Sequence, residues 1–358
     1  MISLLVAAGV ALLLVLLVTP VAIALLRERS VGQFIQEELA GHVHKQGTPT
    51  MGGLVFVISV VVAYFISHVR VWTPADGLGF EWRPPQPGGL LAVLALVGMG
   101  LVGFLDDVIK YSRKRSLGLG KAAKFGLQLV VAALFALWAD QVGVSTEISF
   151  VRPLGIDLGV FFVVWVLIML SGAANGVNLT DGMDGLAAGS SALVFGAYTI
   201  IAFWQFRNSP PAVGAPGVYP EAVDPLELAI IAAAMFGALL GFLWWNAPPA
   251  RIFMGDIGSQ SIGGLLAALA LLSSTQLLLV VLGGIFVIET LSVMIQVASF
   301  RLTGNRVFRM TPIHFHFDLA GWPETTVVIR FWILTALLVA LGLGLFYGDF
   351  LAVEGILG

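Results

Sequence analysis

The chain has 358 residues, of which 58% are hydrophobic and only 11% are charged, whereas an ordinary soluble domain is about 25% charged. Eighteen Lys and Arg residues against twenty-one Asp and Glu residues give a formal net charge of -3, so we expect no nucleic-acid partner. The absence of cysteine excludes disulfides, zinc–thiolate sites, iron–sulfur clusters and thiol nucleophiles. The composition indicates an integral membrane protein, in which charged residues are informative because charge is costly inside a bilayer.

Ten apolar segments have, or nearly have, the roughly 20 residues that a helix needs to cross a bilayer. Four polar residues, 273–276, separate the short eighth segment from the ninth, so nine or eleven spans also fit the pattern. Arg27 and Arg29 follow the first segment and no basic residue precedes it, so we interpret it as an uncleaved span. No linker or repeat divides the chain, and we predict an all-α integral membrane protein with a single domain over 1–358. The segments lie near 2–26, 52–68, 89–105, 122–139, 158–174, 186–204, 226–245, 260–274, 276–299 and 327–347.

The basic residues are distributed unevenly over the nine connections between these segments. The odd-numbered connections and their flanks hold fourteen of the eighteen Lys and Arg residues. Because loops rich in Lys and Arg stay in the cytoplasm, this bias predicts cytoplasmic odd-numbered loops and both termini outside. Any chemistry should therefore face the cytoplasm.

Two adjacent carboxylates, Asp106 and Asp107, end the third predicted span, and Lys110 follows one helical turn later. On a continuing helix, spacings of four and three residues place Lys110 beside both aspartates. Adjacent carboxylates at the edge of a low-dielectric region repel each other unless a cation neutralises them. Mg²⁺ is the obvious candidate, because it takes hard oxygen ligands together with substrate phosphates. The alternative is a helix end that only marks the membrane surface.

Four polar side chains recur at a strict interval of three in NGVNLTDGMDG, namely Asn175, Asn178, Asp181 and Asp184. On an ideal helix they would spread over half of the circumference. The interspersed glycines favour an irregular or broken helix whose polar side faces a cavity. A glycine-rich turn with local side-chain hydrogen bonds is the alternative.

Two further acidic residues stand apart from these motifs. Asp256 lies between glycines after the seventh span, with Phe253 just before it. Taken alone, the two would be a helix N-cap and a packing residue, but Asp256 adds a third acidic group to the same predicted membrane face. A divalent cation and a phosphate-bearing substrate would explain all three groups. Glu289 lies well inside a predicted span, so we expect it to face the protein interior or a cavity.

Histidines occur in two of the predicted cytoplasmic loops. His314 and His316 alternate in the last loop, and on an extended segment they would project to the same side. Such a pair is suited to metal ligation, acid–base chemistry or phosphate binding, although solvated loop histidines are the alternative. In the first loop, His42, His44 and Lys45 precede the glycine pair of GTPTMGG and add phosphate-compatible donors.

These motifs resemble those of the phospho-N-acetylmuramoyl-pentapeptide-transferases, a branch of the polyprenyl-phosphate sugar-1-phosphate transferase superfamily. The similarity runs from GTPTMGG at 47–53 through DDVIK, the NGVNLTDGMDGLA stretch and FMGDIGS to RMTPIHFHFDLAGWPETTVVIRFW at 309–332. GTPTMGG and the histidine loop with GWPE are the signals specific to this branch. One departure is Phe315, which stands where the branch usually carries the middle one of three histidines.

The resemblance implies an activity and its partners. The substrates would be UDP-MurNAc-pentapeptide and undecaprenyl phosphate, and the products undecaprenyl-diphospho-MurNAc-pentapeptide (lipid I) and UMP, in peptidoglycan biosynthesis at the bacterial plasma membrane. It also implies Mg²⁺ as cofactor and a homodimer. A sister transferase that uses another UDP-HexNAc is one alternative. A cation-coupled transporter is another, although it would place its carboxylates near the bilayer midplane and within related halves.

The resemblance also implies residue roles. Asp256 matches the magnesium ligand of the family, and Asp106 and Asp107 match its essential pair. We expect Asp106 to orient or deprotonate the lipid phosphate and Asp107 to support the metal, while a route through an aspartyl phosphate remains open. Lys110 and Lys124 would neutralise phosphate charge, with Lys121 as the alternative to Lys124. Phe253 would stack on uracil, and Lys45 and Thr50 would close the nucleoside pocket, which would be lined by Asn175, Asn178, Asp181 and Asp184. His314 and His316 would contact the diphosphate or the sugar.

Overall fold

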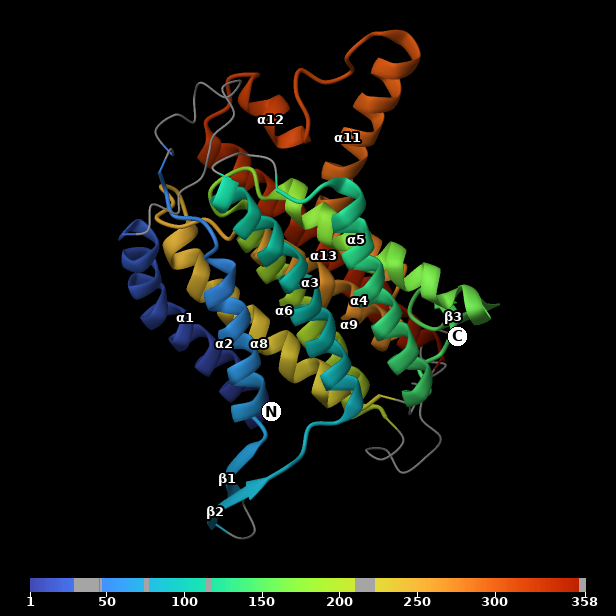
Figure 1. The fold of residues 1–358 in the computed structure, drawn as a ribbon. Coiled ribbons are helices and arrows are strands. Elements are labelled where there is room, and N and C mark those ends of the chain that lie inside the picture. Colours follow the sequence, from blue (N-terminus) through green and yellow to red (C-terminus); the bar gives the residue numbers. More distant parts are fainter. Residues whose placement is uncertain (29–44, 46, 74–76, 114–117, 210–222, 354–358) are drawn as a thin grey trace.

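The computed structural model describes residues 1–28, 45, 47–73, 77–113, 118–209 and 223–353, which form a helical bundle with two short β-hairpins (Figure 1). The helices are α1 (Ile2–Glu28), α2 (Gly53–Ile66), α3 (Pro87–Arg113), α4 (Lys121–Val142), α5 (Phe162–Thr180), α6 (Leu186–Arg207), α8 (Pro225–Asn246), α9 (Gly255–Leu272), α10 (Leu278–Leu282), α11 (Gly284–Thr303), α12 (Ile313–Asp318) and α13 (Glu324–Val353). The strands are β1 (Val69–Thr73), β2 (Gly77–Trp82), β3 (Glu147–Ser149) and β4 (Pro153–Asp157).

Each of the ten predicted apolar segments is helical, so the all-α fold class is confirmed. Among the described residues, nine helices are long and apolar enough to cross a membrane. The exception is α2, whose 14 residues extend only about 21 Å at 1.5 Å per residue. The ninth predicted segment is interrupted at Gly283, which follows the short α10 and precedes α11.

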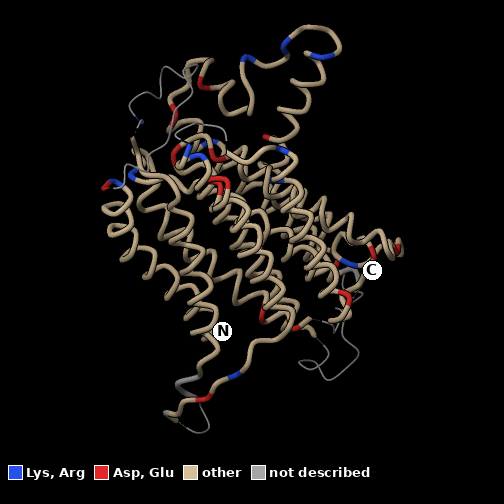
Figure 2. The backbone as a smooth tube through the Cα atoms, in the orientation of Figure 1, with Lys and Arg blue, Asp and Glu red and all other residues tan. Residues whose placement is uncertain are grey.

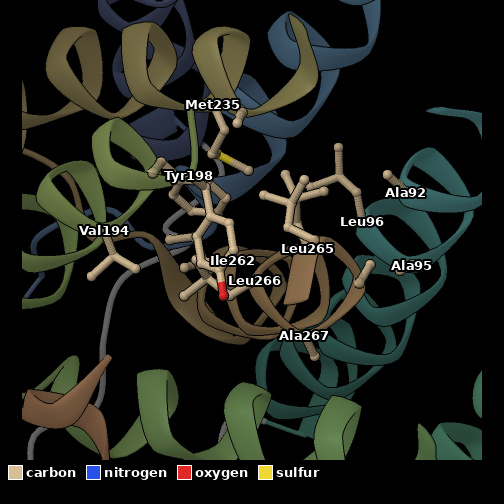
Figure 3. Close-up of a cluster of buried hydrophobic side chains, with 14 of the residues drawn as sticks. Ala92, Ala95, Leu96, Val194, Tyr198, Met235, Ile262, Leu265, Leu266 and Ala267 are labelled. Atoms are coloured by element: carbon tan, nitrogen blue, oxygen red, sulfur yellow. The ribbon is translucent and has the colours of Figure 1, made fainter. Parts of the chain in front are cut away.

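Helix α9 lies at the centre of the bundle, and every residue from 257 to 272 is buried. Figure 3 shows Ile262, Leu265 and Leu266 of α9 among apolar side chains from α3, α6 and α8. A close backbone approach fixes α9 against α3, because a Cβ added to Gly103 would lie 2.2 Å from the carbonyl oxygen of Asp256. Small residues at such crossings let membrane helices pack without intervening side chains.

The first turn of α9 is positioned so that its polar side chains lie beside those of α3 and α5. Gly255 has a φ of 70°, and this left-handed turn directs α9 into the bundle beside the last turns of α3 and α5. We call this end of the bundle the site end. Figure 2 shows that charged residues are concentrated toward the ends of the helices and are scarce along their middle.

The two β-hairpins lie away from the site end. Antiparallel pairs join Val69 with Trp82 in β1–β2 and Glu147 with Asp157 in β3–β4. Figure 1 shows β1–β2 extending beyond the helices at the opposite end of the bundle.

Candidate active site

Three carboxylates from two helices meet at the site end. Asp106 and Asp107 come from α3 and Asp256 from the first turn of α9, and one oxygen of each lies within 4.8 Å of the others. We call this group the acidic cluster. Asp106 and Asp107 are buried and Asp256 is half-buried. Buried carboxylates in such proximity are unfavourable without compensating cations.

Two lysines supply part of this compensation. The Nζ atom of Lys110 lies 2.7 Å from Asp106 and 3.9 Å from Asp107, which confirms the contact predicted from helical spacing, and 3.0 Å from Asp256. The Nζ atom of Lys124 lies 2.7 Å from the other oxygen of Asp256. Lys121 is exposed in the first turn of α4, so the structure brings Lys124 to the cluster and not Lys121. Three carboxylates with two ammonium groups leave one formal negative charge.

Hydrogen bonds orient each carboxylate of the acidic cluster. The backbone N–H of Leu119 donates to Asp106 over 2.8 Å, and that of Ile257 donates to Asp107 over 3.0 Å. The Asn178 amide donates to Asp256 over 3.0 Å and to Ser259 over 2.8 Å. The cluster therefore offers several fixed, hard oxygen atoms, and this donor set fits Mg²⁺ better than a softer metal.

The Asn/Asp stretch differs in part from its predicted conformation. Helix α5 is regular through Asn175 and Asn178 and ends at Thr180, and the chain is broken only between α5 and α6. The predicted break is therefore confirmed after Thr180, whereas the first half of the stretch is regular helix. Gly176 does not unwind the helix but lies against α11, where an added Cβ would be 3.3 Å from side-chain atoms of Phe286 and Thr290.

The four polar side chains of this stretch therefore lie in different parts of the site end. Asn178 binds the acidic cluster, whereas Asn175 is exposed one turn earlier on α5. Asp181 follows the last turn of α5, and Asp184 lies in the turn that leads to α6. Burial, together with the charges of Asp256 and Asp107, raises the pKa of Asp181 to about 8. A proton or a cation is therefore favoured at this position.

A second group of charges lies around Lys45. Its Nζ atom is 2.6 Å from Oδ1 of Asp184 and 2.5 Å from Oε1 of Glu324. The same oxygen of Glu324 accepts the backbone N–H of Asp184 over 2.9 Å, and the backbone N–H of Ala250 donates to Oδ2 of Asp184 over 2.8 Å. We call Lys45, Asp184 and Glu324 the lysine latch.

Glu324 was not predicted as a site residue. Its one signal was the GWPE motif, and a glutamate in the first turn of a helix after proline is equally typical of ordinary helix starts. Asn246 was also missed. Its side chain accepts the N–H of Gly185 and donates to the carbonyl of Ile252, and it thereby joins the end of α8 to the α5–α6 turn.

The GTPTMGG segment connects the two groups of charges. It pairs with the chain before α9, because the Phe253 N–H donates to the carbonyl of Pro49 and the Gly52 N–H donates to the carbonyl of Phe253, both over 2.8 Å. Phe253 is half-buried. Thr50 is near the acidic cluster, since a Cβ on Gly255 would lie 3.1 Å from its Oγ1 atom and 2.6 Å from Oδ2 of Asp107.

The histidine loop is not extended, so the expectation that both imidazoles project to one side was wrong. The residues form α12, and positions two apart on a helix point in different directions. His314 is fully buried with Nδ1 3.0 Å from Oε1 of Glu289, which confirms that Glu289 faces the interior. His316 accepts the backbone N–H of Arg309 over 3.1 Å. His42 and His44 lie outside the described residues.

Phe315 takes the position between the two histidines. It is 8% exposed, and its ring centroid lies 4.2 Å from that of His314. A Cβ on Gly182 would meet both rings, at 2.3 Å from Nε2 of His314 and 3.0 Å from Phe315. The two rings therefore pack directly on the turn that carries Asp181.

Sequence comparisons define the class of protein. The family model described as "Glycosyl transferase family 4" matches residues 90–274, which include the whole acidic cluster. The model "Phospho-N-acetylmuramoyl-pentapeptide-transferase signature 1" matches residues 45–57, which begin with the latch lysine. With its helical bundle, the chain is a multi-pass membrane protein of glycosyl transferase family 4.

Similar proteins specify the branch. Proteins named phospho-N-acetylmuramoyl-pentapeptide-transferase from Frankia casuarinae and Renibacterium salmoninarum are 52% and 49% identical, and each match covers 98% of this chain and 99% of the relative. One from Streptomyces coelicolor is 50% identical over 94% of this chain and 96% of the relative. The chain belongs to the phospho-N-acetylmuramoyl-pentapeptide-transferase family. This confirms the resemblance and favours this branch over the sister transferases and over a transporter.

Proposed function

We propose that the chain transfers phospho-MurNAc-pentapeptide from UDP-MurNAc-pentapeptide to undecaprenyl phosphate, yielding lipid I and UMP for peptidoglycan synthesis. The observation that carries the proposal is the acidic cluster with its two lysines, adjoined by the lysine latch in a chain of this family. Reacting phosphates are anionic, so a site for their transfer must combine a cation, positive side chains and fixed oxygen ligands.

The residues of the acidic cluster suit the reacting phosphates. An oxygen of the lipid phosphate attacks the phosphorus attached to the sugar, the bond from that phosphorus to the bridging oxygen breaks, and UMP leaves. We assign Asp106 to orienting the lipid phosphate or accepting its proton, and Lys110 and Lys124 to neutralising phosphate charge. Both lysines are partly exposed, at 30% and 19% of their side-chain area, so they can turn toward a bound anion.

Asp107 and Asp256 would hold Mg²⁺. When bound, the ion supplies charge neutralisation at the transferred phosphoryl group and at the departing phosphate. The proposal is supported by the donor set, since these carboxylates carry backbone and amide hydrogen bonds that fix their orientation. Chelation should therefore abolish turnover, and added Mg²⁺ should restore it.

The nucleoside end of the substrate would bind between Phe253 and the lysine latch. We assign Phe253 to stacking on uracil and Asp184 to its polar edge, with Lys45 and Thr50 closing the pocket. Asp181 would line the route from this pocket to the acidic cluster, and Asn178 would act through Asp256. Asn175, one turn farther along α5 from the pocket, would contact the substrate beyond the cluster. His314 and His316 would lie near the diphosphate or sugar.

An apolar groove gives a route for the lipid chain. It has a volume of about 240 Å³ between α5, α9, α10 and α11, and it extends along α5 from Ile168 to Gly176, two residues before Asn178. Ile168 and Leu291 on its rim are 53% and 46% exposed. A groove that opens to the lipid-facing surface at one side and approaches the acidic cluster at its end suits a polyprenyl phosphate held in the membrane.

We place the site end in the cytoplasm of a bacterium, at the plasma membrane, with both termini outside. This orientation rests on the excess of Lys and Arg in the loops at that end, and it is required by a soluble nucleotide substrate. Family resemblance further suggests a homodimer, which size measurement in mild detergent would test.

The function is tested by incubating the purified protein with undecaprenyl phosphate, Mg²⁺ and either UDP-MurNAc-pentapeptide or UDP-GlcNAc. We expect a lipid product and UMP from the muramoyl substrate and at most a trace from UDP-GlcNAc. Turnover of UDP-GlcNAc alone would assign the chain to the sister activity. The absence of a lipid product from both substrates, in a preparation that binds UMP, would refute a transferase function.

A further inference from the structure

We propose that Glu324 is a positioning residue for nucleobase specificity. It holds Lys45 and Asp184 together as a donor–acceptor pair that distinguishes uracil from cytosine. The inference rests on the proposed function, because it takes the nucleoside pocket to bind a uridine nucleotide. It adds a residue from the start of α13 to a pocket otherwise formed by the GTPTMGG segment and the turns beside α6 and α9.

One oxygen of Glu324 contacts both members of the pair. Oε1 lies 2.5 Å from Nζ of Lys45 and accepts the backbone N–H of Asp184 over 2.9 Å. Lys45 and Asp184 are in turn 2.6 Å apart. Glu324 therefore fixes the ammonium and the carboxylate relative to each other, although it lies 279 residues from Lys45 in the chain.

Burial makes this arrangement rigid. The side chains of Lys45, Asp184 and Glu324 are 9%, 4% and 19% exposed. An ammonium withdrawn from water needs hydrogen-bond partners, and a single carboxylate would leave it free to rotate about that contact. With two carboxylates, the Lys45 Nζ is held at a defined point.

The contacts leave a specific hydrogen-bonding capacity for a ligand. Lysine has three N–H donors, and Asp184 and Glu324 take two of them. Asp184 accepts Lys45 at Oδ1 and Ala250 at Oδ2, and each carboxylate oxygen can accept about two hydrogen bonds. With respect to the described residues, the pair therefore presents one remaining N–H donor beside a carboxylate acceptor.

This pattern is complementary to uracil and not to cytosine. Uracil presents a carbonyl oxygen next to its N3–H, an acceptor beside a donor, whereas cytosine presents an amino group next to an unprotonated N3, a donor beside an acceptor. Cytosine would face the ammonium with a donor and the carboxylate with a lone pair. Unpaired polar groups in a buried site produce strong discrimination.

The test measures KM for UDP-MurNAc-pentapeptide and the inhibition constants of UMP and CMP in wild type, Glu324→Gln and Glu324→Ala. We expect Glu324→Ala to raise KM about tenfold or more, to change kcat less than about threefold, and to reduce the preference for UMP over CMP by a similar factor. Glu324→Gln retains an acceptor and should lie between wild type and Glu324→Ala. Asp349→Asn, which removes the partner of Arg152 outside the pocket, is the matched control and should leave all constants unchanged.

A double-mutant cycle tests whether Glu324 acts through Lys45. If it does, Lys45→Ala combined with Glu324→Ala should be no worse than Lys45→Ala alone, whereas additive losses would overturn the inference. An unchanged ratio of the UMP and CMP inhibition constants in Glu324→Ala would also overturn the inference. If the melting temperature of that variant fell while the ratio stayed the same, Glu324 would have a purely structural role. If the wild-type protein forms no lipid product, the proposed function is refuted. The role of Glu324 can still be tested in that case, by measuring how strongly UMP and CMP protect each variant against thermal unfolding.

Discussion

The acidic cluster and a second buried carboxylate, at the other end of the bundle, differ in how many hydrogen-bonding and charged partners surround them. Glu227, at the start of α8, accepts a hydrogen bond from the Tyr64 hydroxyl. It also accepts one from Nε2 of His68, which lies 3.1 Å from Oε1 and 3.0 Å from Oε2 of Glu227. We call these three residues the opposite-end network. All three are at most 3% exposed, and this one carboxylate has two donors of its own.

The acidic cluster instead brings three carboxylates together with two partly exposed lysines. Its own groups do not complete the neutralisation, which leaves affinity for a cation and for phosphates at that point. In the opposite-end network, the described side chains instead supply two buried donors for a single carboxylate. We infer that the first arrangement serves chemistry and the second serves stability, and each prediction below tests one side of this contrast.

The largest effect is expected at Asp256, which contacts both lysines and Asn178. Asp256→Asn keeps the shape but removes the charge, so we expect kcat to fall about 10³-fold, a loss of about 4 kcal/mol of transition-state stabilisation. The melting temperature should fall only modestly, because the loss of the ion pairs with Lys110 and Lys124 is partly offset by relief of the repulsion from Asp107. Turnover assays and thermal unfolding on the same preparation measure both quantities, and full activity in this variant would remove Asp256 from the site.

Glu227→Ala should have the reverse profile. It leaves the Tyr64 hydroxyl and the His68 ring buried without their acceptor, so we expect a loss of stability of about 3 kcal/mol. The kcat of the remaining folded protein should stay within about twofold of wild type. Thermal unfolding in detergent and turnover below the transition would separate these outcomes, and a loss of kcat without a loss of stability would contradict the structural role.

Lys124 and Lys121 provide a matched pair one helical turn apart. Lys124→Ala removes the 2.7 Å contact to Asp256 and one positive charge from the proposed phosphate site, so we expect kcat/KM to fall about 30-fold, equivalent to about 2 kcal/mol. Lys121→Ala should change kcat/KM by less than about threefold, since that side chain is exposed and makes no ion pair with the described carboxylates of the cluster. Equal losses in the two variants would mean that both lysines reach the substrate.

Much of the contrast was accessible from the sequence. Hydropathy located all ten helical segments, because a span of about 20 apolar residues has few alternatives. Helical spacing correctly predicted that Lys110 contacts Asp106. The cost of charge in a bilayer correctly predicted that Glu289 faces the protein interior.

What could not be predicted depended on contacts between distant segments. No local pattern indicates that Glu324 meets Lys45, nor that α9 is the central helix whose first turn places Asp256 beside α3. The alternation of His314 and His316 suggested an extended segment, but contacts with Glu289 and Arg309 stabilise a short helix instead. Tertiary packing outweighed the local pattern at this position.

The smallest expected effect is a pH dependence of the opposite-end network. Burial lowers the pKa of His68 because it disfavours the charged ring, and the charge of Arg83 lowers it further. Hydrogen bonds to Glu227 and to the backbone of Tyr64, together with the negative charge of Glu227, raise it. The raising effects are larger, so the pKa of His68 lies above its ordinary value of 6.5. A raised pKa in the folded state means that protonated His68 stabilises the protein fully below the unfolded-state value and that this contribution disappears as pH rises through the folded-state value.

We therefore expect the melting temperature to fall as pH rises above the ordinary histidine pKa of about 6.5, with a change in stability of about 1 kcal/mol or less. His68→Gln retains a donor to Glu227 but does not titrate, so its profile should be flatter over this range. Asp224, which Arg83 faces at 3.7 Å, has a pKa raised by burial, and because it is unchanged in His68→Gln it contributes equally to both profiles. An identical slope in wild type and His68→Gln would assign the titration to another group and leave the opposite-end network as a set of uncharged hydrogen bonds around Glu227.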